Sequence, residues 1–425
     1  MAHGLLKSSQ TRRIMFKNRK KFKITEAFSN EDWVSFHKDF SDTYKNTDWR
    51  YDVFGSEAGL GNIIWNRNLL NADLQGLPHR AEISEDSFYR YDKGGFGDNS
   101  FMLFIEAKAR RDGKYKNNDK LRLASELIFD PLASTRIQKT DYVSSLMSDK
   151  LASNHVYDKN ILIWDGPNEF IDLANNKLRS LKDTPNISNQ IGASTIAFSI
   201  DGHLLLIRQT KKNQHSVGKL APSGSGSLDW ADIEDSKPYW KIQKNGFCDL
   251  LAIAKYGAMR ELLEECGLRK KIKQIDLDLP INYGVSNCIL PLGFAQNVKR
   301  AGKPEFYFLA VLPFTELQIK HALLDKSEKP FTQNIEGAIS ERINLLNDEN
   351  SLKSALHKVC KTYKDINSVK KLLGPQGGHI KGLSYPFLQG ISLLEAALQD
   401  QTVNTKILKW LKEKTIFHAE KYQFL

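Results

Sequence analysis

Long apolar runs are missing from this sequence. No stretch approaches the roughly 18 apolar residues that a membrane-spanning helix requires, and the N-terminus lacks the apolar core of a secretion signal. We therefore expect no membrane partner. Cysteine is also scarce, and the spacing of the four residues matches no paired set of metal ligands. This argues against a structural zinc site and favours reduced, buried thiols in a cytoplasmic protein. The four are Cys248, Cys266, Cys288 and Cys360.

Charge of both signs is abundant, with an excess of basic residues. The 61 Lys and Arg outnumber the 50 Asp and Glu, which gives a formal net charge of +11. In residues 1–26 the only acid is Glu26. Such an arm can neutralise the phosphates of a nucleic acid, but no recognised nucleic-acid module accompanies it, which favours a solvated terminus. The arm's basic residues are Lys7, Arg12, Arg13, Lys17, Arg19, Lys20, Lys21 and Lys23.

The most informative stretch is Arg260-Glu-Leu-Leu-Glu-Glu-Cys-Gly-Leu268. On a helix, positions three and four apart lie on one face, so Glu261, Glu264 and Glu265 converge on one patch. Clustered carboxylates repel each other unless a cation lies among them, and Mg²⁺ prefers oxygen ligands and binds substrate phosphates. Gly267 favours the left-handed conformation that ends helices, which predicts a helix ending near Cys266.

This run resembles the second half of the Nudix box, Arg-Glu-U-x-Glu-Glu-x-Gly-U, in which U is a bulky aliphatic residue. All seven specified positions match. The first half is less regular, because counting back from Arg260 in the family spacing places Ala252 where the family has Glu. A second register is better. There the segment 222–226, Pro-Ser-Gly-Ser-Gly, resembles the family's glycine turn, Asp232 supplies the acid, and residues 233–248 are an insertion before a helix that begins near Asp249.

The flanking segments fit the same resemblance. Residues 195–200 and 204–208 form two apolar runs around Asp201-Gly202, which predicts a hairpin. Residues 288–294 and 305–312 predict two further strands around the basic turn 299–303. The resemblance covers about 188–345 and implies an α/β fold, a Nudix-type α/β/α sandwich with a mixed sheet.

The rest of the chain does not match the family pattern. The expected parts are a basic arm (1–26), an α+β domain (27–185), the Nudix-like domain (188–345) and a helical C-terminal extension (346–425). In the second part we expect strands at 100–107 and 160–164 and a helix at 169–181. A polar linker is expected at 182–190, and helices at 316–324, 344–363 and 403–414.

The resemblance implies a metal-dependent pyrophosphohydrolase that cleaves the diphosphate linkage of a nucleoside diphosphate joined to another moiety. Mg²⁺ or Mn²⁺ would be held by Glu261, Glu264 and Glu265, and Arg260 would position a carboxylate. Glu261, Glu305 and Glu316 are the alternatives for the general base. Further candidates for substrate binding are Arg208, Gly224, Gly226 and Glu305.

Two other hypotheses stay open at this point. In one, the domain is catalytically silent and acts as a nucleotide sensor or an interaction module, which the irregular first half of the box favours. In the other, the basic arm binds nucleic acid. The nucleotide substrate and the oligomeric state are not encoded in any motif of this sequence.

Overall fold

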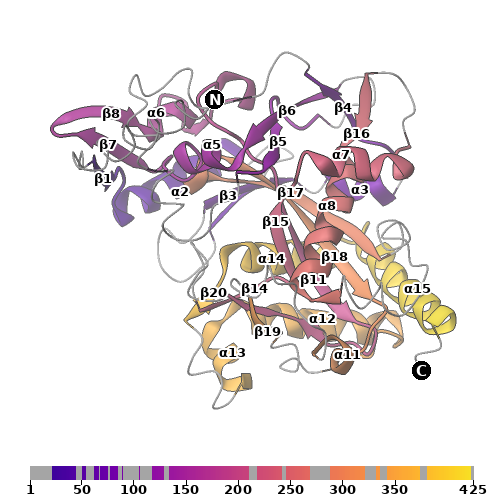
Figure 1. The fold of residues 1–425 in the computed structure, drawn as a ribbon. Coiled ribbons are helices and arrows are strands. Elements are labelled where there is room, and N and C mark those ends of the chain that lie inside the picture. The colour runs from indigo at the N-terminus through magenta and orange to yellow at the C-terminus, as the bar shows by residue number, and fades with distance from the viewer. Residues whose placement is uncertain are drawn as a thin grey trace, which may run out of the picture.

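The computed structural model describes residues 22–44, 50–53, 62–66, 68–74, 77–84, 89, 105, 117–128, 134–209, 218–241, 246–268, 288–320, 332–335, 342–373 and 381–422. Most of the basic arm lies outside these ranges, as does the expected strand 100–107 apart from Ile105. The described residues form a mixed α/β structure (Figure 1). None of their helices is both long enough and apolar enough to cross a membrane.

The helices occur throughout the described chain. They are α2 (Asn30–Tyr44), α3 (Asn68–Leu74), α5 (Tyr142–Met147), α6 (Gly166–Phe170), α7 (Ala231–Ser236), α8 (Leu250–Glu265), α11 (Glu316–Lys320), α12 (Glu349–Lys364), α13 (Ile366–Leu373), α14 (Tyr385–Gln399) and α15 (Asn404–Tyr422). Short 3₁₀ turns are η2 (Leu181–Asp183), η3 (Lys237–Tyr239) and η4 (Val298–Arg300).

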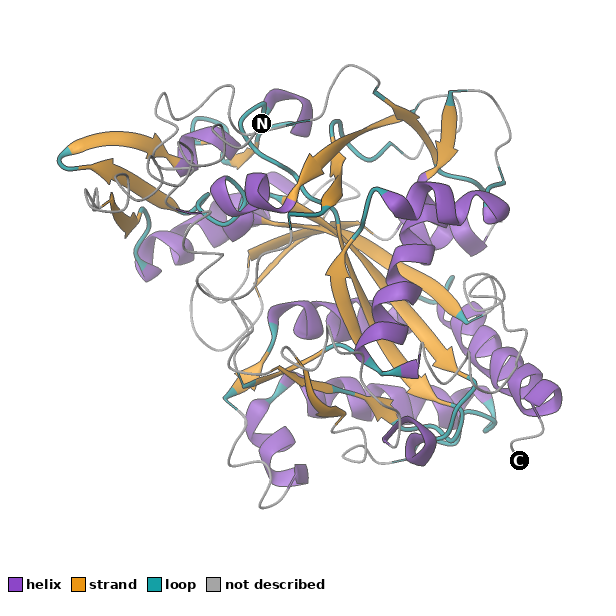
Figure 2. Ribbon diagram, viewed as in Figure 1, coloured by secondary structure: helices purple, strands orange, loops and turns teal. Residues whose placement is uncertain are grey.

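A large mixed sheet lies at the centre of the molecule (Figure 2). Its strands are β2 (Arg50–Val53), β3 (Asn62–Asn66), β11 (Gly192–Ser199), β12 (Leu204–Leu205), β15 (Gly224–Ser227), β17 (Ile289–Asn297) and β18 (Lys303–Leu312). They follow the order β12-β11-β18-β17-β3-β2, and β15 also pairs with β11. β11 and β18 are parallel, and the other pairs are antiparallel.

Smaller sheets surround the central one. One has the order β16 (Phe247–Asp249), β4 (Arg80–Ile83), β6 (Thr135–Asp141), β5 (Asp119–Leu123). A second has the order β1 (Phe22–Glu26), β7 (Asn154–Asp158), β8 (Ile161–Asp165). A third has the order β19 (Thr332–Ile335), β13 (Ile207–Gln209), β14 (Lys219–Ala221), β20 (Gly382–Leu383), and β9 (Ile171–Asp172) pairs with β10 (Lys177–Leu178).

Alternating side chains on β11 separate two hydrophobic cores, because successive residues of a strand point to opposite faces of the sheet. Ala193 and Ala197 belong to the core that contains the buried residues of α8. Ile196 and Phe198 belong to the core that contains those of α12, α14 and α15. The sheet therefore has α8 on one face and α14 on the other, as Figure 1 shows.

The sheets continue across the expected domain boundaries. β3, from the part before residue 185, pairs with β17, and β4 pairs with β16, which leads directly into α8. The helices after residue 346 share a core with β11 and β18. The N-terminal and C-terminal parts thus build the surroundings of the segment 188–345.

Several local predictions are confirmed. The hairpin turns at Asp201-Gly202, where Gly202 has a φ of +83°, and the strands expected at 160–164, 288–294 and 305–312 correspond to β8, β17 and β18. The helix expected at 316–324 is helical over its described residues as α11, the one expected at 344–363 begins five residues later as α12, and the one expected at 403–414 corresponds to α15. All four cysteines are free and buried.

Two local predictions are wrong. The helix expected at 169–181 stops at Phe170, because the Asp172 carboxylate accepts hydrogen bonds from the backbone and side-chain amides of Asn175 and stabilises a turn between β9 and β10. The expected linker 182–190 is packed at its end. Asn189 and Gln190 are buried and donate their backbone N–H groups to the carboxylate of Asp149.

Candidate active site

The helix that carries the Nudix-like run begins and ends where the sequence predicts. The Asp249 side chain caps the start of α8 by accepting a hydrogen bond from the backbone N–H of Ala252 at 3.3 Å. Cys266 is the C-terminal cap, and Gly267 follows with a φ of +68°. Both ends are therefore set by local signals that hold the acidic run in helical register.

The glycine segment lies as a strand against this helix. A Cβ atom at Gly226 would lie 2.1 Å from the carboxyl carbon of Glu261, and one at Gly224 would lie 2.5 Å from the Cα of Leu262. Between them, the backbone N–H of Ser225 donates to the Glu265 carboxylate at 2.7 Å. The segment expected to be a turn is thus β15, paired with β11, and its glycines permit close approach of the helix.

The guanidinium of Arg260 lies among four carboxylates. Its Nε and Nη2 donate to the two oxygens of Asp232 at 2.9 and 3.1 Å, and its Nη1 donates to Glu261 at 2.9 Å and to Glu264 at 3.5 Å. Nη2 also lies 3.5 Å from Asp229. Burial lowers the pKa of Arg260, but the carboxylates, Glu261 foremost, raise it by more, so the guanidinium stays charged.

The Asp232 contact agrees with the second register of the box. Asp232 is 1% exposed, and it lies 28 residues before Arg260 in the sequence. Burial raises the pKa of Asp232, and the hydrogen bonds and charge of Arg260 oppose that rise. The intervening residues 233–248 hold most of α7, η3 and the start of β16. The insertion therefore leaves the acid and the arginine in contact.

Sequence reasoning missed the part of the site that comes from the N-terminal segments. Lys120 on β5 forms an ion pair with Asp229, and the backbone of β5 bonds to Leu228 and Trp230 on either side of it. His79 donates its backbone N–H to Asp249, the cap of α8, at 3.3 Å. These partners are more than 100 residues apart, and no sequence motif marks them.

Three candidates from the sequence make their contacts elsewhere in the described structure. Glu305 accepts hydrogen bonds from Ser194 at 2.6 Å and from Lys303 at 3.4 Å. It lies two residues before Tyr307, whose side chain belongs to the core on the α14 face, so Glu305 points away from α8. Arg208 lies in the sheet of β13 and β14. Glu316 forms an ion pair with Lys320 on α11.

The donor chemistry of the cluster suits a hard divalent cation. Glu261 and Glu264 have side chains that are 15% and 17% exposed, whereas Glu265 is 8% exposed and turned toward Ser225. Carboxylate oxygens at a partly solvated helix end are the ligands that Mg²⁺ prefers. The carboxylates of Glu261 and Glu264 accept hydrogen bonds from Arg260, and that of Glu265 accepts one from Ser225. The described residues contain no group of three or more acidic, His or Cys side chains gathered as metal ligands.

Comparison with the models of known protein families and with curated proteins gives no match to this chain.

Proposed function

We propose that the protein is a Nudix-type hydrolase that uses Mg²⁺ or Mn²⁺ to cleave the diphosphate linkage of a nucleoside diphosphate joined to another moiety. The observation that carries the proposal is the contact of Arg260 with Asp232 on one side and with Glu261 and Glu264 on the other. It joins both halves of the box in one ion-paired cluster. The placement of α8 and α14 on opposite faces of a mixed sheet supports a Nudix-type sandwich.

In this proposal each residue has a distinct task. Glu261, Glu264 and Glu265 would hold the divalent cation, which when bound neutralises phosphate charge and lowers the pKa of a coordinated water. Before a cation binds, Arg260 holds Glu261 and Glu264 beside the site, and it stays charged while doing so. Gly226 leaves room for the Glu261 carboxylate beside β15, and the Ser225 N–H fixes that of Glu265.

The alternative is a catalytically silent Nudix domain that binds a nucleotide as a sensor or interaction module. The hydrogen bonds that Arg260 makes to Glu261 and Glu264 favour it, because they engage the same carboxylates that a metal would need. The proposed hydrolase requires these side chains to turn from Arg260 toward the cation. A silent domain requires no such change.

Turnover of phosphate compounds with Mg²⁺ or Mn²⁺ tests the two functions. The panel holds ADP-ribose, dinucleotides, nucleotide sugars, nucleoside triphosphates and coenzyme A, with a Glu264→Gln/Glu265→Gln protein as the control. Metal-dependent cleavage that the control loses supports the hydrolase and names its substrate class. Absence of cleavage, together with thermal stabilisation by one compound, supports the sensor.

A further inference from the structure

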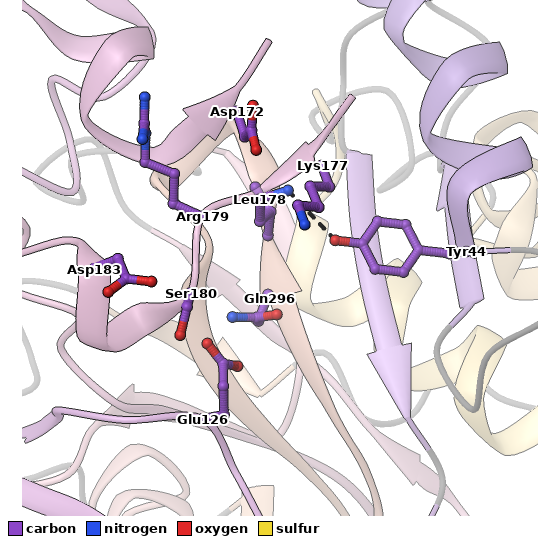
Figure 3. A pocket seen from close by; sticks show the side chains of 9 residues that line it. All are labelled: Tyr44, Glu126, Asp172, Lys177, Leu178, Arg179, Ser180, Asp183 and Gln296. Carbon is purple, nitrogen blue, oxygen red and sulfur yellow. Dashed lines mark hydrogen bonds between the residues drawn. The ribbon is translucent and has the colours of Figure 1, made fainter. Parts of the chain in front are cut away.

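A polar cavity of about 370 Å³ lies apart from the carboxylate cluster and shares no residue with it. It opens between the end of α2, the β9–β10 hairpin with the turn that follows, the segment after β5, and β17 (Figure 3). Its volume lies within the range of about 300–1,000 Å³ that is typical of small-molecule sites. Neither the Nudix-like run nor the proposed hydrolysis gives this cavity a role.

The carboxylates of Glu126 and Asp183 line the cavity, and Lys182 is the cation whose charge acts on Glu126. Glu126 accepts a hydrogen bond from the backbone N–H of Leu181 at 2.5 Å, and its carboxylate forms no ion pair with any described residue. Burial raises the pKa of Glu126, opposed by the hydrogen bonds of Leu181 and Ser180. A ligand cation at this position would offset the cost of burying the carboxylate.

The amide of Gln296 also faces the cavity beside Glu126. Gln296 on β17 is 6% exposed, and within the described part of the chain its side chain makes no hydrogen bond. Figure 3 shows the amide of Gln296 pointing into the space beside Glu126 and Ser180. Buried amides are normally hydrogen-bonded. The Gln296 amide therefore offers a donor and an acceptor to a ligand in the cavity, next to the carboxylate.

The rim of the cavity carries cations instead. Lys177 and Arg179 are exposed, and neither side chain forms an ion pair with a described residue. Arg179 donates its Nε to the backbone carbonyl of Asn168 at 3.1 Å, and Figure 3 shows its side chain pointing away from Glu126 and Gln296. The rim carboxylate of Asp172 is engaged by Asn175 through both oxygens. The cavity thus combines the half-buried carboxylate of Glu126 and the exposed one of Asp183 with two exposed cations, Lys177 and Arg179.

We propose that this cavity binds a small zwitterion of the amino-acid class. The ligand ammonium group donates to Glu126 and to the Ser180 hydroxyl at the base, and the Gln296 amide bonds to the ligand beside them. The ligand carboxylate lies at the mouth and pairs with Lys177 and Arg179. This orientation places each charge of the ligand against an opposite charge of the protein, and it gives the Gln296 amide a partner in the cavity.

Other ligand classes fit less well. A phosphate at the base would face Glu126 and be repelled by it, and a neutral sugar would leave both Glu126 and the rim cations without a counter-ion. A bound divalent cation would find no gathered set of acidic ligands, because the described residues contain no such group. Ribose and inorganic phosphate therefore serve as contrasting probes.

Calorimetric titration of the full-length protein with the standard L-amino acids tests the proposal. The matched probes are the corresponding 2-hydroxy acids, in which a hydroxyl group replaces the ammonium. We expect at least one amino acid to bind, and its 2-hydroxy counterpart to bind roughly tenfold or more weakly. Glu126→Gln, which keeps the size of the side chain and removes its charge, should weaken binding by a similar factor.

Two further variants sharpen the result. Gln296→Met should weaken binding about fivefold by removing the amide, and it decides the case if Glu126→Gln fails to fold. Glu169→Gln on α6, which removes an acid that does not line the cavity, should bind as the wild type does. The proposal is overturned if no amino acid binds, if Glu126→Gln retains wild-type affinity, or if ribose or phosphate binds instead.

The cavity can be tested separately from the site of the proposed hydrolase. Glu264→Gln should leave amino-acid binding unchanged, because Glu264 does not line the cavity. Loss of binding in Glu264→Gln would contradict a separate site, whereas loss of diphosphate turnover in the same variant concerns only the hydrolase.

Discussion

Arg260 and Asp232 lie 28 residues apart in the chain and form a bidentate ion pair, with hydrogen bonds of 2.9 and 3.1 Å. Asp232 is almost fully buried, so Arg260 is the cation that compensates its charge inside the protein. The same guanidinium bonds to Glu261 at 2.9 Å. The pair therefore connects the stability of the α7–α8 contact with the position of a proposed metal ligand.

Replacing Arg260 with Met should lower the free energy of unfolding by about 3 kcal/mol, because it leaves the buried Asp232 carboxylate without a partner. Denaturant unfolding of the single variants and of the Arg260→Met/Asp232→Asn double variant measures this coupling. We expect the double variant to be more stable than Arg260→Met alone. Additive losses in the two single variants would contradict the coupling.

The two glycines of β15 give a matched pair of predictions. Gly226→Ala pushes its Cβ against the flexible carboxylate of Glu261, so it should abolish most turnover while changing stability by less than about 1 kcal/mol. Gly224→Ala pushes its Cβ against the backbone of Leu262 and should cost about 2 kcal/mol or more. Thermal unfolding and turnover are measured for both, and equal stability losses would contradict this assignment of the contacts.

Local signals explain why the box helix could be predicted. The Asp249 cap and the left-handed Gly267 each act within one turn of the helix, so the sequence alone indicates both ends. Asp232 could be found by counting from Gly226, although its contact with Arg260 depends on how residues 233–248 fold. The exact side-chain arrangement of Glu261, Glu264 and Glu265 depends on competing partners and is not encoded in their spacing.

Long-range placement explains what could not be predicted. Lys120 and Asp229 meet because β5 bonds to the backbone on both sides of Asp229, and no periodic pattern reveals a contact across 109 residues. Glu305 lies on a correctly predicted strand, but a one-residue change of register decides which face its side chain occupies. The register places it against Ser194, on the face opposite α8.

The basic arm supports a prediction about nucleic acid. Residues 1–21 lie outside the described residues, and β1 begins at Phe22. Deleting residues 1–21 should leave turnover of a small diphosphate substrate within about twofold of wild type, because the described site is built without them. A collapse of turnover would place the arm in the site. Nucleic-acid affinity that falls steeply with salt in the full chain only would instead show phosphate binding by the arm.

His79 should make the protein sensitive to acid near the start of the box helix. Its imidazole is buried and lies 3.0 Å from the hydroxyl of Thr135, and burial lowers the pKa of His79 to about 4. The unfolded chain, in which the pKa is about 6.5, therefore binds a proton more readily. The neutral His79 therefore makes its full contribution to the free energy of unfolding above a pH of about 6.5. This contribution is lost as the pH falls toward 4, and at pH 5 the loss is about 2 kcal/mol.

Denaturant unfolding of the wild type and of His79→Gln at pH 7.5 and pH 5 isolates this contribution from that of the carboxylates. The amide does not titrate, so the variant should lose about 2 kcal/mol less stability than the wild type between the two pH values. Because His79 bonds through its backbone to the Asp249 cap, acid should also release the start of α8 early. Hydrogen exchange at Leu250, whose N–H donates to the His79 carbonyl, measures that release, and equal acid sensitivity of both proteins would rule out His79 as its cause.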